Sequence, residues 1–226
     1  MIAVIVPAHN EQHLLGPCLR ALLRARRQVG ALGESVQIVV VLDDCSDASE
    51  AVARAHQVEV LKVSARNVGY ARRAGAALML ARGARWLAFT DADSCVPVGW
   101  LVCQLDFAAD AVCGTVHVAR WQADQHAALR ARYLAHYQAR EGHRHIHGAN
   151  LGVCAKAYER VGGFQPLAVH EDVQLVSALH ASGAHIVWTV LNSVSTSSRG
   201  DCRVSGGFGD FLKRLGEPAP GLEDRP

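Results

Sequence analysis

Residues 36–44 read VQIVVVLDD, an apolar run that ends on two aspartates. A run without polar alternation is typical of a strand buried on both faces, as in parallel sheets covered by helices. Short apolar runs also occur at 2–6, 58–63 and 86–90, and helical patterns separate the four runs at 14–27, 47–56 and 69–82. Strands that alternate with helices in this way predict an α/β fold, with a central, mostly parallel, twisted sheet flanked by helices.

Beyond residue 95 the alternation is less regular. There the pattern predicts helices at 97–109, 124–141 and 171–182, strands at 112–118, 148–154 and 186–191, and a mobile loop at 193–209. The 226 residues therefore predict a single domain from 1 to 215, with halves at 1–95 and 96–215, and a flexible tail at 216–226.

The composition excludes several classes of protein. Half of the residues are apolar and 19% are charged, so the chain can bury a core instead of being disordered. A net charge of +2 lacks the basic excess of proteins that coat nucleic acid, so we expect no nucleic-acid partner. Seven cysteines without a C-x-x-C pair do not suit a disulfide framework or a zinc ribbon, which favours the cytoplasm. No apolar stretch reaches the ~20 residues needed to span a bilayer, so we expect a soluble protein with at most peripheral membrane contact.

Polar side chains follow each of the four predicted strands. The carboxyl ends of parallel strands meet at one edge of a sheet, and ligands bind there. The polar residues at these ends are His9, Asn10, Glu11, Asp43, Asp44, Arg66, Asn67, Asp91 and Asp93. Carboxylates, amides and a guanidinium at four separate strand ends predict a polar ligand site.

Asp91 and Asp93 form the sharpest of these motifs, because they flank Ala92 directly after a buried strand. Two carboxylates at this spacing can direct oxygens at one hard divalent cation, which a diphosphate would share. The alternative, a loop with two solvated or capping aspartates, is equally compatible with so short a motif.

Two further motifs suit a nucleotide. Asp43 or Asp44 can accept hydrogen bonds from a base or from ribose hydroxyls, although capping of the next helix is a competing role. A predicted helix begins with Asn67, Gly69 and Arg72. The amino terminus of a helix favours a phosphate group, the glycine permits close approach of that group to the backbone, and the arginine can pair with phosphate oxygens. A capped helix with surface arginines remains the alternative there.

The second half contributes carboxylates and imidazoles. Glu171 and Asp172 begin a predicted helix, either as partners of its dipole or as a general base that takes a proton from an attacking hydroxyl. His143, His145 and His147 alternate along the chain. They could bind zinc, but we favour polar wall residues of an acceptor site, or one further ligand of the divalent cation.

Taken together, the motifs resemble those of family 2 glycosyltransferases with the GT-A fold. The resemblance runs in order from residue 2 to about 182. It rests on Pro7-Ala8-His9-Asn10-Glu11, Asp43–Asp47, Asn67-x-Gly69-x-x-Arg72, Asp91-Ala92-Asp93, Gly148-Ala149-Asn150, Gly162-Gly163-Phe164 and Glu171-Asp172.

The resemblance implies a role for each half of the chain. Residues 1–95 would bind a UDP- or GDP-linked sugar, and 96–215 would bind an acceptor that carries a hydroxyl group. The segment from Pro7 to Glu11 and one of Asp43 and Asp44 would hold the nucleoside. Asp91 and Asp93 would carry Mg²⁺ or Mn²⁺ against the ribose or diphosphate. Asp172, with Glu171 beside it, matches the catalytic base of members that invert the sugar's configuration.

The chain also departs from part of the family. It lacks the Q-x-x-R-W motif of polymer-forming synthases, and residues 196–209 stand in its place. We expect Arg199 and Arg203 there to lie on a lid that closes over the donor diphosphate.

Two alternative functions stay open. A phosphohydrolase of the haloacid dehalogenase type also uses D-x-D, although after its first strand, and a non-catalytic protein could bind nucleotide sugars without turnover. The sugar, the acceptor and a homodimer are not decided by any motif.

Overall fold

The computed structural model describes residues 1–121, 127–137, 139–197 and 215. In the first half, strands and helices alternate as β1 (Ile2–Ala8), α1 (Leu15–Gly30), β2 (Val36–Asp43), α2 (Ser49–Ala55), β3 (Glu59–Val63), α3 (Val68–Ala81) and β4 (Trp86–Phe89). The second half contains α4 (Trp100–Asp106), β5 (Ala111–Arg120), α5 (Ala127–His136), β6 (Leu151–Cys154), α6 (Ala155–Arg160), α7 (Glu171–Ala181) and β7 (Ile186–Ser197).

The strands form one seven-stranded sheet in the order β3-β2-β1-β4-β6-β5-β7. β6 runs antiparallel to both of its neighbours, whereas the other pairs are parallel. The predicted α/β fold with a mostly parallel sheet is therefore confirmed. Because β1 lies between β2 and β4, the carboxyl ends of the first-half strands meet at one edge.

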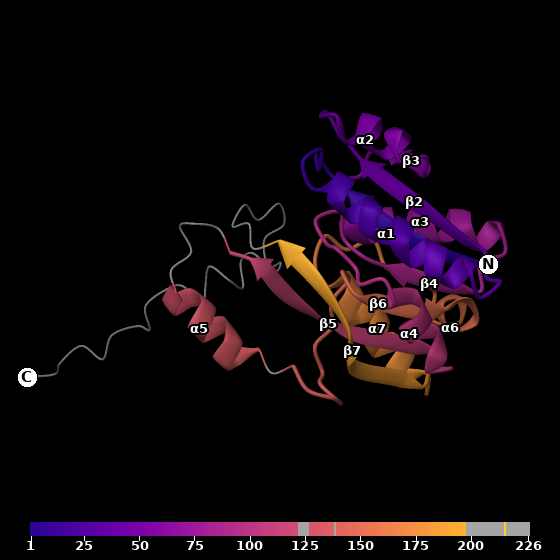
Figure 1. Ribbon diagram of the computed structural model, residues 1–226. Coiled ribbons are helices and arrows are strands. Elements are labelled where there is room, and N and C mark those ends of the chain that lie inside the picture. Colours follow the sequence, from indigo (N-terminus) through magenta and orange to yellow (C-terminus); the bar gives the residue numbers. More distant parts are fainter. Residues whose placement is uncertain (122–126, 138, 198–214, 216–226) are drawn as a thin grey trace, which may run out of the picture.

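Helices cover both faces of the sheet, as Figure 1 shows. Alternate residues of β1 face opposite layers: Ile2 and Val4 pack with α1, α2 and α4, whereas Ala3 and Ile5 pack with α3, α6 and α7. This double coverage explains why β1 and β2 are almost continuously apolar. No helix in the described ranges is long and apolar enough to cross a membrane.

Some predicted boundaries in the second half are wrong. The helix expected at 124–141 ends at His136, because Glu141 instead turns toward β7 and accepts hydrogen bonds from Thr189 and Val190. Residues 193–197 are not loop but the end of β7, since they pair with β5 beyond an irregularity in the register. The rest of the expected loop, with Arg199 and Arg203, and the tail at 216–226 lie outside the described residues.

Close packing of α3 on the sheet gives a first prediction. A Cβ atom on Gly75 would lie 2.7 Å from Ile5 Cγ2 and 2.8 Å from Val41 Cγ2, both in the core. We expect Gly75→Ala to lower the free energy of unfolding by about 1–3 kcal/mol, because overpacking outweighs the better helix propensity of alanine. Urea unfolding followed by circular dichroism measures this.

Gly30, the last residue of α1, provides the control, since no atom lies within 4 Å of its added Cβ. Gly30→Ala should leave stability unchanged or raise it slightly. If Gly75→Ala is as stable as the wild type, the proposed contact between α3 and the sheet is incorrect.

Candidate active site

A cleft of about 930 Å³ lies at the carboxyl ends of the first-half strands. Its walls come from both halves of the chain, so residues that are far apart in sequence meet there. The predicted site residues on the walls are Pro7, Ala8, His9, Asn10, Glu11, Asp43, Asn67, Arg72, Asp91, Ala92, Asp93, Glu171 and Asp172. Asp44 and Gly69 do not line the cleft.

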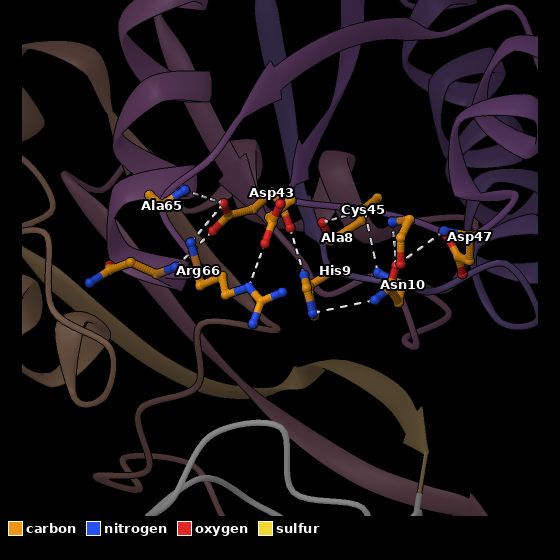
Figure 2. Close-up of polar contacts among 11 residues, drawn as sticks. Ala8, His9, Asn10, Asp43, Cys45, Asp47, Ala65 and Arg66 are labelled. Atoms are coloured by element: carbon orange, nitrogen blue, oxygen red, sulfur yellow. Dashed lines mark hydrogen bonds and ion pairs between the residues drawn. The ribbon is translucent and has the colours of Figure 1, made fainter.

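The loop after β1 is tied to the loop after β2, as Figure 2 shows. His9 Nδ1 donates a hydrogen bond of 2.6 Å to the carbonyl oxygen of Asp43, which can only accept. Asn10, with a left-handed φ of 55°, accepts a bond of 2.8 Å from the amide of Ser46. Both side chains therefore fix the shape of the cleft wall before any ligand binds.

The buried carboxylate of Asp43 holds the turn that leads into α3 (Figure 2). It accepts backbone hydrogen bonds from Ala65 at 2.7 Å, Arg66 at 2.9 Å and Asn67 at 2.7 Å. The adjacent Asp44 points elsewhere and forms an ion pair with Arg66. Neither aspartate caps α2, because the N-cap of that helix is Ala48.

The amino terminus of α3 is occupied by the protein itself. Asn67 accepts a hydrogen bond from the amide of Tyr70 and so caps the helix. The amide of Gly69 donates to the carbonyl oxygen of Leu167, and a Cβ atom at Gly69 would collide with backbone of the same loop. Packing against residues 165–167 thus accounts for the glycine, and a phosphate contact at Gly69 stays a prediction.

Arg72 is the buried cation of the site, with 3% of its surface exposed. Its Nη2 lies 2.6 Å from Asp91 Oδ1, and its Nη1 pairs with Glu171. Burial acts to lower the pKa of Arg72, but Asp91 and Glu171 outweigh it, so the pKa is raised and the charge is kept. The alternative interpretation of Arg72 as a surface arginine is therefore wrong, whereas its expected contact with a phosphate stays a prediction.

Backbone and ring groups enclose the guanidinium of Arg72. Its Cζ atom lies 5.7 Å from the ring centre of Phe164, and a side chain on Gly148 would collide with it. The amide of Gly148 in turn donates a bond of 2.7 Å to Asp172 Oδ2. Gly148 thus connects Arg72 with Asp172, because it packs against the guanidinium and donates to the carboxylate.

The two carboxylates at the start of α7 have different environments. Glu171 is 4% exposed, and burial raises its pKa although Arg72 acts to lower it. Asp172 is only partly buried and lines the cleft, where its oxygens accept hydrogen bonds from the amides of Gly148 and Val173. Asp172 is therefore the better placed of the two to accept a proton from a ligand.

Asp91 and Asp93 offer oxygen ligands at the end of β4. No group of three or more His, Cys, Asp or Glu residues in the described part of the chain is arranged to hold a metal ion. Magnesium and manganese, however, often bind through one or two carboxylates together with substrate phosphates and water. Arg72 contacts only one oxygen of the partly exposed Asp91. The pair thus fits a cation that a diphosphate shares.

The alternating histidines are packed together on the wall that the second half of the chain contributes to the cleft. Both ring nitrogens of His143 are engaged, one with the carbonyl oxygen of Thr189 and the other with the amide of His145. His145 stacks on Tyr137 with 4.2 Å between ring centres, and the Tyr137 hydroxyl lies 3.0 Å from His147 Nε2. His145, His147 and Tyr137 line the cleft, as expected for polar wall residues.

Tyr137 and Thr196 are among the cleft residues to which the sequence analysis gave no role. Tyr137 was assigned to a helix without a functional role, although an aromatic residue near a histidine cluster could have indicated it. Thr196 lines the cleft and lies 3.0 Å from Ser94 through its hydroxyl oxygen, because β7 is longer than predicted.

Comparison with known proteins gives the following findings. The family model described as Glycosyl transferase family 2 matches residues 3–160. No curated protein sequence matches the chain significantly.

Among solved structures, S. aureus TarS 1-349 in complex with UDP-GlcNAc has a TM-score of 0.67 and 13% identity over 95% of this chain and 64% of that one. The S. aureus TarS structure has a TM-score of 0.64 and 15% identity over 87% and 37%. The mannosyltransferase PcManGT from Pyrobaculum calidifontis, in complex with GDP-Man and Mn²⁺, has a TM-score of 0.64 and 19% identity over 89% and 58%. The chain thus spans less than two thirds of each, and these likenesses establish the GT-A fold.

The partly buried imidazole of His147 gives a pH prediction. Burial, together with His145 and His143, lowers its pKa to about 4, although Asp172 acts in the opposite direction. The folded protein therefore binds a proton at His147 less readily than the unfolded chain does. The contribution of His147 to folding stability is complete above the unfolded pKa of ~6.5, and it is lost as the pH falls toward 4. We expect the free energy of unfolding to decrease by about 2 kcal/mol between pH 7 and pH 5 through this group.

Urea unfolding of His147→Gln at both pH values measures the contribution, since glutamine can still bond to Tyr137 but does not titrate. The variant should show a flatter pH dependence than the wild type. His13→Gln, at an exposed position, should keep the wild-type slope. Equal slopes for all three proteins would contradict the assignment.

Proposed function

The chain belongs to glycosyl transferase family 2, and we propose that it transfers a sugar from a nucleoside diphosphate donor to the hydroxyl group of an acceptor. The observation that carries this proposal is the meeting of Asp91, Asp93 and Asp172 on the walls of one cleft. Asp91 and Asp93 could hold a cation that a diphosphate shares, and Asp172 could accept a proton within the same cleft.

The donor would occupy the first half of the cleft, formed by residues 1–95. The segment from Pro7 to Glu11 would hold the nucleoside together with Asp43, which lines the same cleft. UDP-GlcNAc in one structural neighbour and GDP-Man in another support a UDP- or GDP-linked donor. Asp91 and Asp93 would hold Mg²⁺ or Mn²⁺, which would neutralise charge on the departing diphosphate.

Asp172 would act as the general base. Its carboxylate takes the proton of the acceptor hydroxyl, whose oxygen attacks the anomeric carbon as the bond to the donor phosphate breaks. Attack opposite the leaving group inverts the sugar's configuration. Glu171 would not touch the substrate but would hold Arg72 in place.

The second half, residues 96–215, would bind the acceptor. His145, His147 and Tyr137 offer polar and aromatic contacts on that wall. Arg199 and Arg203 would close over the diphosphate from the segment beyond β7. The family match and the position of D-x-D after β4 argue against a phosphohydrolase.

The third prediction concerns turnover. With a panel of UDP- and GDP-linked sugars and Mn²⁺, we expect slow release of nucleoside diphosphate, and Asp93→Ala should abolish it through loss of a metal ligand. Asp172→Asn should reduce transfer by about 10²–10⁴-fold while the affinity for the donor stays within a few-fold, because the base acts only in the chemical step. Asp106→Asn, at an exposed position on α4, is the control.

Other outcomes would identify other functions. Tight binding of a nucleotide sugar without release would indicate a non-catalytic binding protein. Release of inorganic phosphate from sugar phosphates would indicate a phosphohydrolase. Full transfer activity of Asp172→Asn would remove that residue from the mechanism.

A further inference from the structure

Helix α1 presents a row of arginines to solvent. The exposed side chains of this helix are Arg20, Arg24, Arg27 and Gln28, and the helix contains no acidic residue. Residues at positions i, i+4 and i+7 lie on one face of a helix, so the three arginine side chains leave the same face of α1 over about 10 Å. We call Arg20, Arg24 and Arg27 the α1 stripe.

Folding stability does not explain the α1 stripe. Like charges at i, i+4 and i, i+3 repel each other and destabilise a helix. Only Arg27 lies in the last turn, where a cation favours the helix dipole. In the described part of the chain none of the three forms an ion pair, whereas the exposed Arg54 and Arg82 pair with glutamates.

An exposed apolar side chain lies in a turn that the carboxyl-terminal end of α1 approaches. Val98, in the turn between β4 and α4, is 49% exposed. The side chain of Gln28 approaches the adjacent Gly99, at 3.9 Å from an added Cβ. Burial raises the pKa of the Cys95 thiol in the same turn, and the positive charges of Arg24 and Arg20 act to lower it. In Figure 1, α1 and α4 lie on the same side of the sheet.

We propose that the α1 stripe and Val98 form a docking surface for a membrane that contains anionic lipids. Arginine heads would bind phosphate groups of the lipids, and Val98 would enter the boundary between headgroups and acyl chains. A nucleic acid suits this surface less well, because the stripe is short, an apolar side chain projects next to it and the net charge is only +2. This proposal assigns a surface and not a substrate, so it does not depend on the proposed reaction.

Docking through α1 would also orient the cleft. The helix begins at Leu15, shortly after Glu11 on the cleft wall. The α1 stripe begins at Arg20, so a membrane against it would lie along the α1 and α4 side of the sheet, with the amino-terminal end of α1 toward the cleft.

The test is sedimentation with vesicles of phosphatidylcholine, with and without about one third phosphatidylglycerol. We expect the full chain to bind only the anionic vesicles, and salt to weaken the binding. The triple variant R20Q/R24Q/R27Q should bind roughly a hundredfold more weakly, at about fivefold for each arginine. Val98→Ser should weaken binding by a few-fold, with the same salt dependence as the wild type.

R73Q/R82Q/R160Q is the matched control. These arginines are exposed on or just after α3 and α6, which cover the opposite face of the sheet, and both triple variants change the net charge from +2 to −1. Glutamine is a good helix former, so circular dichroism should find all variants folded. Absence of wild-type binding to anionic vesicles, or an equal loss in the control, would overturn the proposal. So would binding of duplex DNA through the stripe without vesicle binding.

Discussion

The candidate site depends on one buried guanidinium. Arg72 extends from α3 and pairs with Asp91 after β4 and with Glu171 at the start of α7. Removal of such a cation would leave the buried carboxylate of Glu171 without a partner, a loss that costs about 3–5 kcal/mol in buried pairs. Gly148 has no side chain because the guanidinium fills that space. The ion pairs thus constrain the sequence of the surrounding loops.

This arrangement links the two halves of the chain. Asp91 belongs to residues 1–95, whereas Glu171 and Asp172 belong to residues 96–215, and Arg72 and Gly148 connect them. The carboxylates of the cleft are therefore held apart at a fixed spacing before substrates bind. Groups that are already oriented need no reorganisation during the reaction. This preorganisation accounts for much of the rate enhancement of enzymes.

Much of the fold could be predicted because the apolar runs and the polar strand ends are local signals. The roles of single polar residues were harder to predict, since they depend on distant partners. Asp43 lines the cleft, and its expected contact with a nucleoside stays a prediction, but the sequence did not indicate that its carboxylate also holds the backbone of residues 65–67. Arg72 and Glu171 are 99 residues apart, so no spacing rule relates them. The end of β7 was misassigned because pairing with β5, rather than the composition of residues 193–197, determines its length.

A crystal structure of the chain with Mn²⁺ and UDP or GDP tests the central claim most directly. The account predicts a diphosphate in the cleft, a manganese ion in contact with Asp93 and with the oxygen of Asp91 that Arg72 leaves free, and Arg72 still joined to Glu171. A nucleotide bound outside the cleft, or carboxylates of Asp91 and Asp93 that point away from the metal, would contradict it.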